Sequence, residues 1–217
     1  MERRLFDGKK SNLGKIYAKH FLKVYSEHRW PGLKKTVDSY GPKIWTKEMF
    51  RILDKIADKM KLEWKQDEML RIDKAYYRGD SDCPTVVVEH ENGYKGIWDS
   101  ELPRLFAADA NLRVLICYPP EKEHFLLQRR IKGKLNTEMQ ESRFDDEFLL
   151  ILGKNEVYPR KKESFNIYWF YPGIYGKKLI AKSVHFNKCK IVNPVDLGER
   201  MTEYDKVMSE AFYYPYA

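Results

Sequence analysis

The segment 86–91, Val-Val-Val-Glu-His-Glu, constrains this chain more than any other because apolar residues lead directly into two carboxylates. Three consecutive β-branched residues favour a buried strand. Burying a carboxylate costs several kcal/mol unless a partner compensates for it. Side chains at i and i+2 of a strand point to the same face, so we expect Glu89 and Glu91 to face one spot. Two carboxylates placed in this way bind a cation or share a proton.

The composition is that of a folded globular protein. The 217 residues are 43% hydrophobic and 14% aromatic, which is enough for one substantial core, and we expect a single domain over residues 1–217. Lys and Arg number 40 against 32 Asp and Glu, a formal net charge of +8. This balance is compatible with a nucleic-acid or anionic-surface partner.

The spacing of the cysteines and the composition of the first ten residues bear on the cellular compartment of the protein. Cys83, Cys117 and Cys189 are far apart and form no Cys-x-x-Cys pair, which argues against a structural zinc site and a disulfide framework. We therefore expect a reducing, cytoplasmic environment. The segment 1–10 is charged and lacks the apolar stretch of a signal peptide, and no apolar run reaches the length of a membrane span, so no membrane partner is expected.

Periodicity predicts alternating helices and strands. The expected helices cover 13–27, 47–60 with Thr46 as N-cap, 97–110 and 199–212, and the expected strands cover 70–77, 85–91, 112–118, 165–171 and 180–186, with a mixed segment at 144–152. This order is typical of an α/β or α+β domain.

A turn-rich loop at 78–84 predicts a hairpin between the strands on either side of it. If Tyr77 pairs with Thr85, Asp73 lies directly opposite Glu89, and directly opposed Cβ atoms are about 4.5–5.5 Å apart. A slip of one residue would send Asp73 to the other face. The sequence therefore predicts Asp73, Glu89 and Glu91 near one face.

Three carboxylates at this spacing suit Mg²⁺ or Mn²⁺. A metal held by Asp73, Glu89 and Glu91 can polarise a phosphoryl oxygen and lower the pKa of a bound water. Glu91 lies further along the strand and can take the proton from the attacking water. The predicted catalytic and metal-binding set is therefore Asp73, Glu89 and Glu91.

Asp73, then Glu89-His90-Glu91 on the next strand, then a helix and the strand 112–118, resembles the core of the PD-(D/E)xK nuclease superfamily, the restriction-endonuclease-like fold. The resemblance covers about residues 46–118, a third of the chain. It implies a central mixed β-sheet flanked by helices and a Mg²⁺-dependent endonuclease acting on double-stranded DNA. It carries Asp73 and Glu89 over as metal ligands.

Three positions complete or depart from the pattern of the superfamily. Glu91 stands where the superfamily usually has Lys, as in a minority of members with a Glu-x-Glu version. Ile72 replaces the Pro of the name. Many members add a glutamate from the preceding helix, and Glu48 is the matching candidate here. The chain length is similar to that of compact restriction-type endonucleases, which implies a homodimer.

Two basic clusters are candidates for contact with the DNA backbone. We predict that they lie on loops, and their members are Arg129, Arg130, Lys132 and Lys134 in the first cluster and Arg160, Lys161 and Lys162 in the second. Ordinary solvated loops are the alternative for both clusters.

Other interpretations of the same residues stay open. Glu89 and Glu91 can end an edge strand in solvent and pair with Arg71 or Lys74. His90 points to the opposite face and is expected to be a packed histidine, and Arg104 is expected to be a solvated helix charge. Two turn residues are alternative ligands if the register slips, Asp80 and Asp82. The chain could also be a non-catalytic nucleic-acid- or protein-binding module on this fold, or a structural subunit.

Overall fold

The computed structural model describes residues 12–29, 42–65, 71–92, 96–140, 146–153, 165–175, 178–187 and 190–192. The helices are α1 (Leu13–Glu27), α2 (Pro42–Lys59), α3 (Glu101–Ala107) and α4 (His124–Gln140), with a short 3₁₀ helix at Glu121–Glu123. The strands are β1 (Glu63–Trp64), β2 (Lys74–Tyr77), β3 (Val86–Glu91), β4 (Leu112–Cys117), β5 (Glu147–Gly153), β6 (Phe165–Tyr175), β7 (Lys178–Asn187) and β8 (Lys190–Val192).

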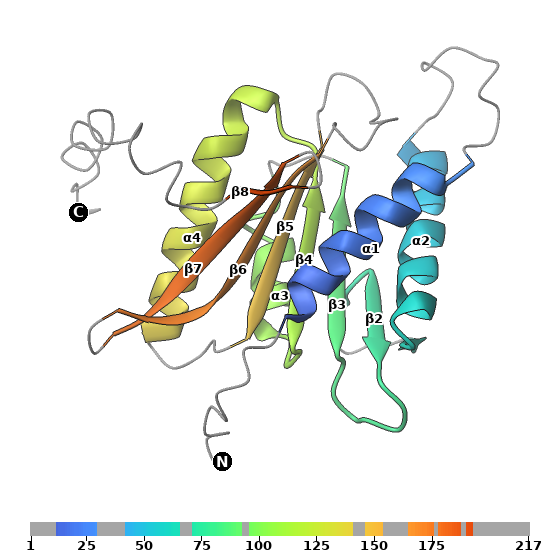
Figure 1. The fold of residues 1–217 in the computed structure, drawn as a ribbon, viewed down its shortest axis with the longest axis horizontal. Coiled ribbons are helices and arrows are strands. Elements are labelled where there is room, and N and C mark those ends of the chain that lie inside the picture. The colour runs from blue at the N-terminus through green and yellow to red at the C-terminus, as the bar shows by residue number, and fades with distance from the viewer. Residues whose placement is uncertain are drawn as a thin grey trace.

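The described strands form one mixed sheet in which spatial order follows chain order, from β1 to β8. Strands β3, β4 and β5 are parallel to one another, and every other neighbouring pair is antiparallel. Helices α3 and α4 make the two parallel crossovers. Figure 1 shows α1 crossing the near face of the sheet, with α3 and α4 behind the strands. The expectation of a mixed sheet flanked by helices is confirmed at this level.

Each face of the sheet has its own core. The central strands β4 and β5 are buried at every position, as expected for strands covered on both sides. On β3, Val86 and Val88 pack with the helices α1 and α2, whereas Val87 packs with α3 and α4. Neighbouring residues of β3 therefore belong to opposite layers.

Helix α1 is fixed to the sheet by a buried carboxylate. Glu147, the first residue of β5, accepts hydrogen bonds from the backbone N–H groups of Leu13 (3.2 Å) and Gly14 (2.6 Å) and from Trp169 Nε1 (2.7 Å). These amides belong to the first turn of α1, where N–H groups have no partner within the helix. A Cβ at residue 14 would meet the indole ring of Trp169 and would lie 2.9 Å from Glu147 Oε2, so the close approach requires glycine.

The predicted helix at 13–27 is confirmed, but α2 begins at Pro42, so Thr46 lies inside the helix and its assignment as N-cap is wrong. Proline is tolerated in the first turn of a helix because that turn needs no N–H donor. Helix α3 begins at Glu101 and is shorter than the predicted helix 97–110.

Most of the predicted strands are present with shifted ends. Strand β2 begins at Lys74 and not at residue 70, and β6 and β7 extend beyond the predicted bounds. The mixed segment becomes a strand from Glu147. The predicted terminal helix at 199–212 lies outside the described residues. None of the described helices combines the length and apolarity that crossing a bilayer requires.

Candidate functional site

The pairing of β2 with β3 has the predicted register. Lys74 lies opposite Val88 and Tyr76 opposite Val86, which is the register that places Tyr77 opposite Thr85. Its extension by one residue brings Asp73 opposite Glu89. The register prediction is confirmed, so Asp73 and Glu89 lie on the face of the sheet covered by α3 and α4.

The carboxylate of Asp73 is held against β3 by the backbone. The N–H of His90 donates a hydrogen bond to Asp73 Oδ2 at 2.8 Å. Burial of the carboxylate raises the pKa of Asp73, whereas the His90 hydrogen bond, Arg104 and a hydrogen bond with Glu89 oppose that rise. The residue as a whole is exposed, although its carboxylate is partly buried.

Glu89 is the buried member of the pair, with 2% of its surface exposed. Burial, and then the charge of Asp73, raise the pKa of Glu89 to about 8, and Arg104 opposes this shift. Arg104 Nε lies 3.2 Å from Glu89 Oε1 in an ion pair. That oxygen accepts no hydrogen bond from any residue that the structure describes. Glu89 thus keeps a buried acceptor oxygen without a hydrogen bond.

Arg104 connects the strand to helix α3. Its Nη2 donates to Glu101 Oε1 at 2.9 Å, and its Nη1 donates to the carbonyl of Arg71 at 3.0 Å. Glu101 is itself buried and accepts a second hydrogen bond, of 2.6 Å, from Ser100 Oγ. The expectation that Arg104 is a solvated helix charge is wrong, because its guanidinium lies between two buried carboxylates.

Glu91 is the last residue of β3 and is half-buried beside Cys117 of β4. Its charge raises the pKa of Asp73, so the two carboxylates interact. Within the described ranges, no three His, Cys, Asp or Glu side chains form a group that could hold a metal ion. Asp80 and Asp82 are exposed in the hairpin loop, at the opposite end of β2 from Asp73.

Glu48 does not join this cluster. It is buried on α2, where its Oε2 lies 3.0 Å from His28 Nε2 and its Oε1 pairs with Arg51. Helix α2 packs on the face opposite Glu89. The prediction of Glu48 as an additional metal ligand is therefore wrong, because Glu48 lies on the other side of the sheet and pairs with His28 and Arg51 there.

His90 is a packed histidine, as predicted. Its Nε2 lies 3.0 Å from the hydroxyl oxygen of Tyr118, and its ring contacts those of Phe50 and Tyr118. Burial lowers the pKa of His90 to about 3, so the ring is neutral at physiological pH. The side chain of His90 packs in the core, and its backbone N–H donates a hydrogen bond to Asp73.

The alternative partners proposed for the glutamates are not used. Lys74 Nζ pairs with Asp54 of α2 at 2.9 Å, on the other face of the sheet. Arg71 contributes its carbonyl to Arg104. Arg104 is the cation beside Glu89.

The first basic cluster, 129–134, lies in helix α4, so its prediction as a loop is wrong. Arg129 stacks over the Phe125 ring, and Lys134 forms an ion pair of 2.6 Å with Glu138. Arg130 is exposed, and Lys132 is half-buried. The second cluster, 160–162, lies outside the described residues.

Comparisons with known proteins give no match to any protein-family model, curated protein or solved structure. The site therefore rests on its own geometry. That geometry is a pair of opposed carboxylates, Asp73 and Glu89, with Arg104 and Glu101 behind them and Glu91 at the rim.

Proposed function

We propose that this protein is a Mg²⁺-dependent hydrolase of DNA phosphodiester bonds, with Asp73 and Glu89 as the metal ligands. The observation that carries the proposal is the buried Glu89 carboxylate, which faces a second acid and keeps one oxygen without a hydrogen bond among the described residues. A carboxylate pair in a buried setting is unfavourable unless a cation or a shared proton compensates for it.

The donor set fits Mg²⁺ or Mn²⁺. Both ions prefer carboxylate oxygens, and Mg²⁺ is commonly held by one or two carboxylates together with waters and substrate phosphates. Asp73 and Glu89 supply two such groups, and the exposed side of Asp73 leaves room for the remaining ligands. When bound, the ion would act as a Lewis acid toward a phosphoryl oxygen.

The chain supplies the other functions of the proposed site. Arg104 lies within 3.2 Å of Glu89 and would stabilise negative charge on a phosphate that approaches the pair. Glu91 would accept the proton of the attacking water, since it lies at the open end of β3 and its charge acts on Asp73. Asp73 and Glu89 would hold the ion in place because the sheet fixes both.

The order of elements supports a restriction-endonuclease-like fold as part of this proposal. Antiparallel β2 and β3 are followed by the crossover helix α3 and the parallel strand β4. Glu48, which lies on the other face, departs from the resemblance to the PD-(D/E)xK superfamily. The formal net charge of +8 supports double-stranded DNA as the substrate, and a cytoplasmic homodimer completes the proposal.

The test is cleavage of supercoiled plasmid in millimolar Mg²⁺ or Mn²⁺, compared with the same reaction in EDTA. We expect nicked or linear product from the wild type and a loss of at least about a hundredfold in Glu89→Gln and Asp73→Asn. Glu138→Gln is the matched control, because Glu138 is an acid on α4 that pairs with Lys134 and lies outside the proposed site. Equal cleavage by Glu89→Gln and the wild type would contradict the proposal.

A second candidate is a non-catalytic nucleic-acid-binding module on the same fold. It is favoured by the ion pair of Arg104 with Glu89, which already places positive charge where a metal would bind. Salt-sensitive DNA binding that survives simultaneous replacement of Asp73, Glu89 and Glu91, with no cleavage and no metal affinity, would select this candidate.

A further inference from the structure

Helix α2 carries a row of basic side chains that the candidate site does not use. The members of this row, called the α2 basic row, recur every four residues and are all exposed: Lys43, Lys47, Arg51, Lys55 and Lys59. At a rise of 1.5 Å per residue, successive members are about 6 Å apart along the axis and the row extends about 24 Å along it. Each step of four residues also turns about 40° around the axis, so the row winds around α2 and neighbouring members share a direction. Side chains four residues apart form one of the surface ridges of a helix.

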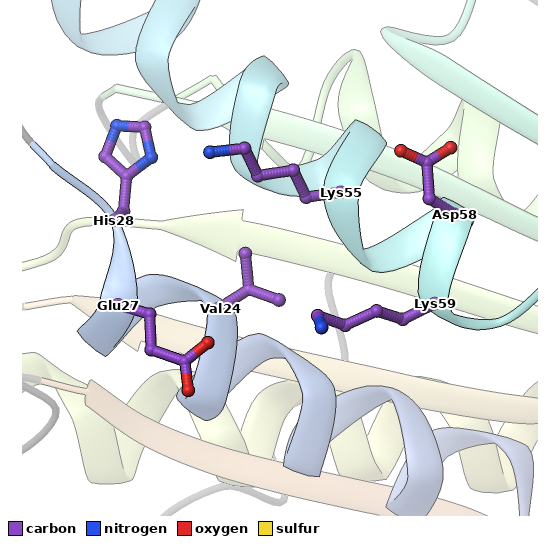
Figure 2. Close-up of a pocket in the computed structure, with 6 residues that line it drawn as sticks. All are labelled: Val24, Glu27, His28, Lys55, Asp58 and Lys59. Atoms are coloured by element: carbon purple, nitrogen blue, oxygen red, sulfur yellow. The ribbon is translucent and has the colours of Figure 1, made fainter.

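Helix α1 adds positive charge beside the end of this row. The pKa of His20 on α1 is lowered by burial and then by the charges of Lys59 and Lys23, so Lys59 of α2 lies close enough to act on α1. A groove of about 400 Å³ separates the helices and is lined by Val24, Glu27, His28, Lys55, Asp58 and Lys59. In Figure 2, Lys55 and Lys59 extend from α2 along this groove toward the residues of α1.

The charge of this surface is poorly compensated. Residues 12–29 and 42–59 contain nine Lys and Arg against four Asp and Glu. Two of these acids are already engaged: Glu48 binds His28 and Arg51 inside the layer, and Asp54 holds Lys74. No ion pair with another described residue is present for the four lysines of the row, Lys43, Lys47, Lys55 and Lys59.

Helix α4 makes a useful contrast, because two of its cations have partners within the fold. Lys134 pairs with Glu138, and Arg129 stacks over Phe125. An isolated surface ion pair contributes little to stability, but it does reduce the charge presented to a partner. The α2 basic row is therefore the more exposed source of positive potential.

The first turns of α2 lie near the end of β3, on the other side of the sheet from Asp73 and Glu89. Asn92 Nδ2 donates a hydrogen bond of 2.8 Å to Thr46 Oγ1, and Asn92 directly follows Glu91. This contact ties the first turns of α2 to the end of β3. The α2 basic row and the carboxylates therefore lie on different faces of the sheet, and their two elements meet at the end of β3.

We propose that the α1–α2 surface, led by the α2 basic row, binds the phosphate backbone of a nucleic-acid duplex. Duplex DNA carries about one negative charge per 1.7 Å of axis, so a row of about 24 Å can meet several phosphates. Lysines that contact phosphates contribute affinity without reading the base sequence. Binding of this kind needs neither the metal nor cleavage, so the inference is independent of the proposed function.

The test is fluorescence anisotropy with labelled duplex DNA and with duplex RNA of the same sequence, in EDTA, over a range of NaCl concentrations. The variant is the triple replacement Lys47→Gln, Lys55→Gln and Lys59→Gln, whose positions are exposed, with folding checked by the melting temperature. We expect the slope of log Kobs against log[salt] to decrease in magnitude by about 2 to 3, since each lost phosphate contact removes roughly 0.9. The triple replacement Lys65→Gln, Arg78→Gln and Lys122→Gln removes the same number of exposed cations from outside α1, α2 and α4 and is the matched control, and we expect it to change the slope less.

Three results would overturn the inference. These are a wild type that binds neither duplex, an α2 triple variant with the wild-type salt slope, and an equal or larger loss of slope in the control triple variant. Binding to phosphatidylserine vesicles that the α2 triple variant loses, without duplex binding, would assign the surface to membranes instead. Failure of cleavage with intact, row-dependent binding would reject the proposed hydrolase and leave this inference standing.

Discussion

The backbone N–H of His90 donates a 2.8 Å hydrogen bond to Asp73 Oδ2, which fixes a carboxylate from the start of β2 against the strand that carries Glu89. The donor belongs to the main chain of a sheet strand, so it cannot rotate away as a side chain can. Asp73 and Glu89 are therefore forced together by the backbone, and their mutual effect on pKa follows from this placement.

The raised pKa of Glu89 predicts that stability falls as pH rises. The pKa moves from 4.5 to about 8 on folding, so between these values the folded protein holds a proton that the unfolded chain releases. The free energy of unfolding should fall with pH in this window, by at most about 1.4 kcal/mol per pH unit. Glu89→Gln should remove this slope in urea unfolding curves recorded in EDTA. An identical slope in wild type and variant would contradict the prediction.

Mg²⁺ should stabilise the folded protein at pH 8 and above, where Glu89 loses its proton. A ligand that binds only the folded state stabilises it by about 2.7 kcal/mol at one hundred times its Kd. We expect the melting temperature to rise with Mg²⁺ in the wild type, and not to rise in Glu89→Gln or Asp73→Asn. NaCl at matched ionic strength is the control, and an equal rise with that salt would show general screening instead of a site.

Arg104→Met should destabilise the protein more at pH 9 than at pH 5. At high pH Glu89 is charged and loses its ion-pair partner, whereas at low pH it is protonated and does not need one. The lost hydrogen bonds to the carbonyls of Ser100 and Arg71 cost the same at both pH values. Denaturant unfolding at the two pH values measures the difference, and equal destabilisation would mean that Arg104 acts through Glu101 and those carbonyls and not through Glu89.

Gly14→Ala should destabilise the protein by roughly 1–3 kcal/mol, the usual cost of overpacking a core. The new Cβ would meet Trp169 and the Glu147 carboxylate, which holds the first turn of α1. Gly133→Ala is the matched control, since a Cβ there meets nothing within 4 Å, and it should stabilise α4 by about 0.5–1 kcal/mol. Thermal or urea unfolding distinguishes the two, and a neutral Gly14→Ala would show that Trp169 can move aside.

The pairing of Asp73 with Glu89 could be predicted from the sequence because strand pairing follows simple geometry. Alternation along β3 and a hairpin with Tyr77 opposite Thr85 are enough to bring Asp73 to Glu89. The contact of Arg104 with Glu89 could not be predicted, because it depends on how helix α3 is rotated on the sheet. Glu101 was missed for a related reason: an acid in the first turn of a helix is common without any further role.

Two other wrong predictions, the loop at 129–134 and the role of Glu48, could have been corrected from the sequence. Leu127, Ile131 and Leu135 are spaced four residues apart and are buried in α4, a pattern that predicts the helix through the first basic cluster. Glu48 and Arg51 are three residues apart on α2, where an ion pair is expected. The placement of Glu48 on the far side of the sheet still depended on which face α2 covers.

Alternate residues of β3 face different layers, so the residues of the candidate site are separate from those that pack against α1 and α2. Val88 and His90 serve one core, while Glu89 and Glu91 stand on the other face. Neutral amides at 73 and 89 would leave the first core untouched. The acids at 73 and 89 are therefore not needed for the packing of α1 and α2 on the sheet, and a change at either position can alter the site without altering that layer.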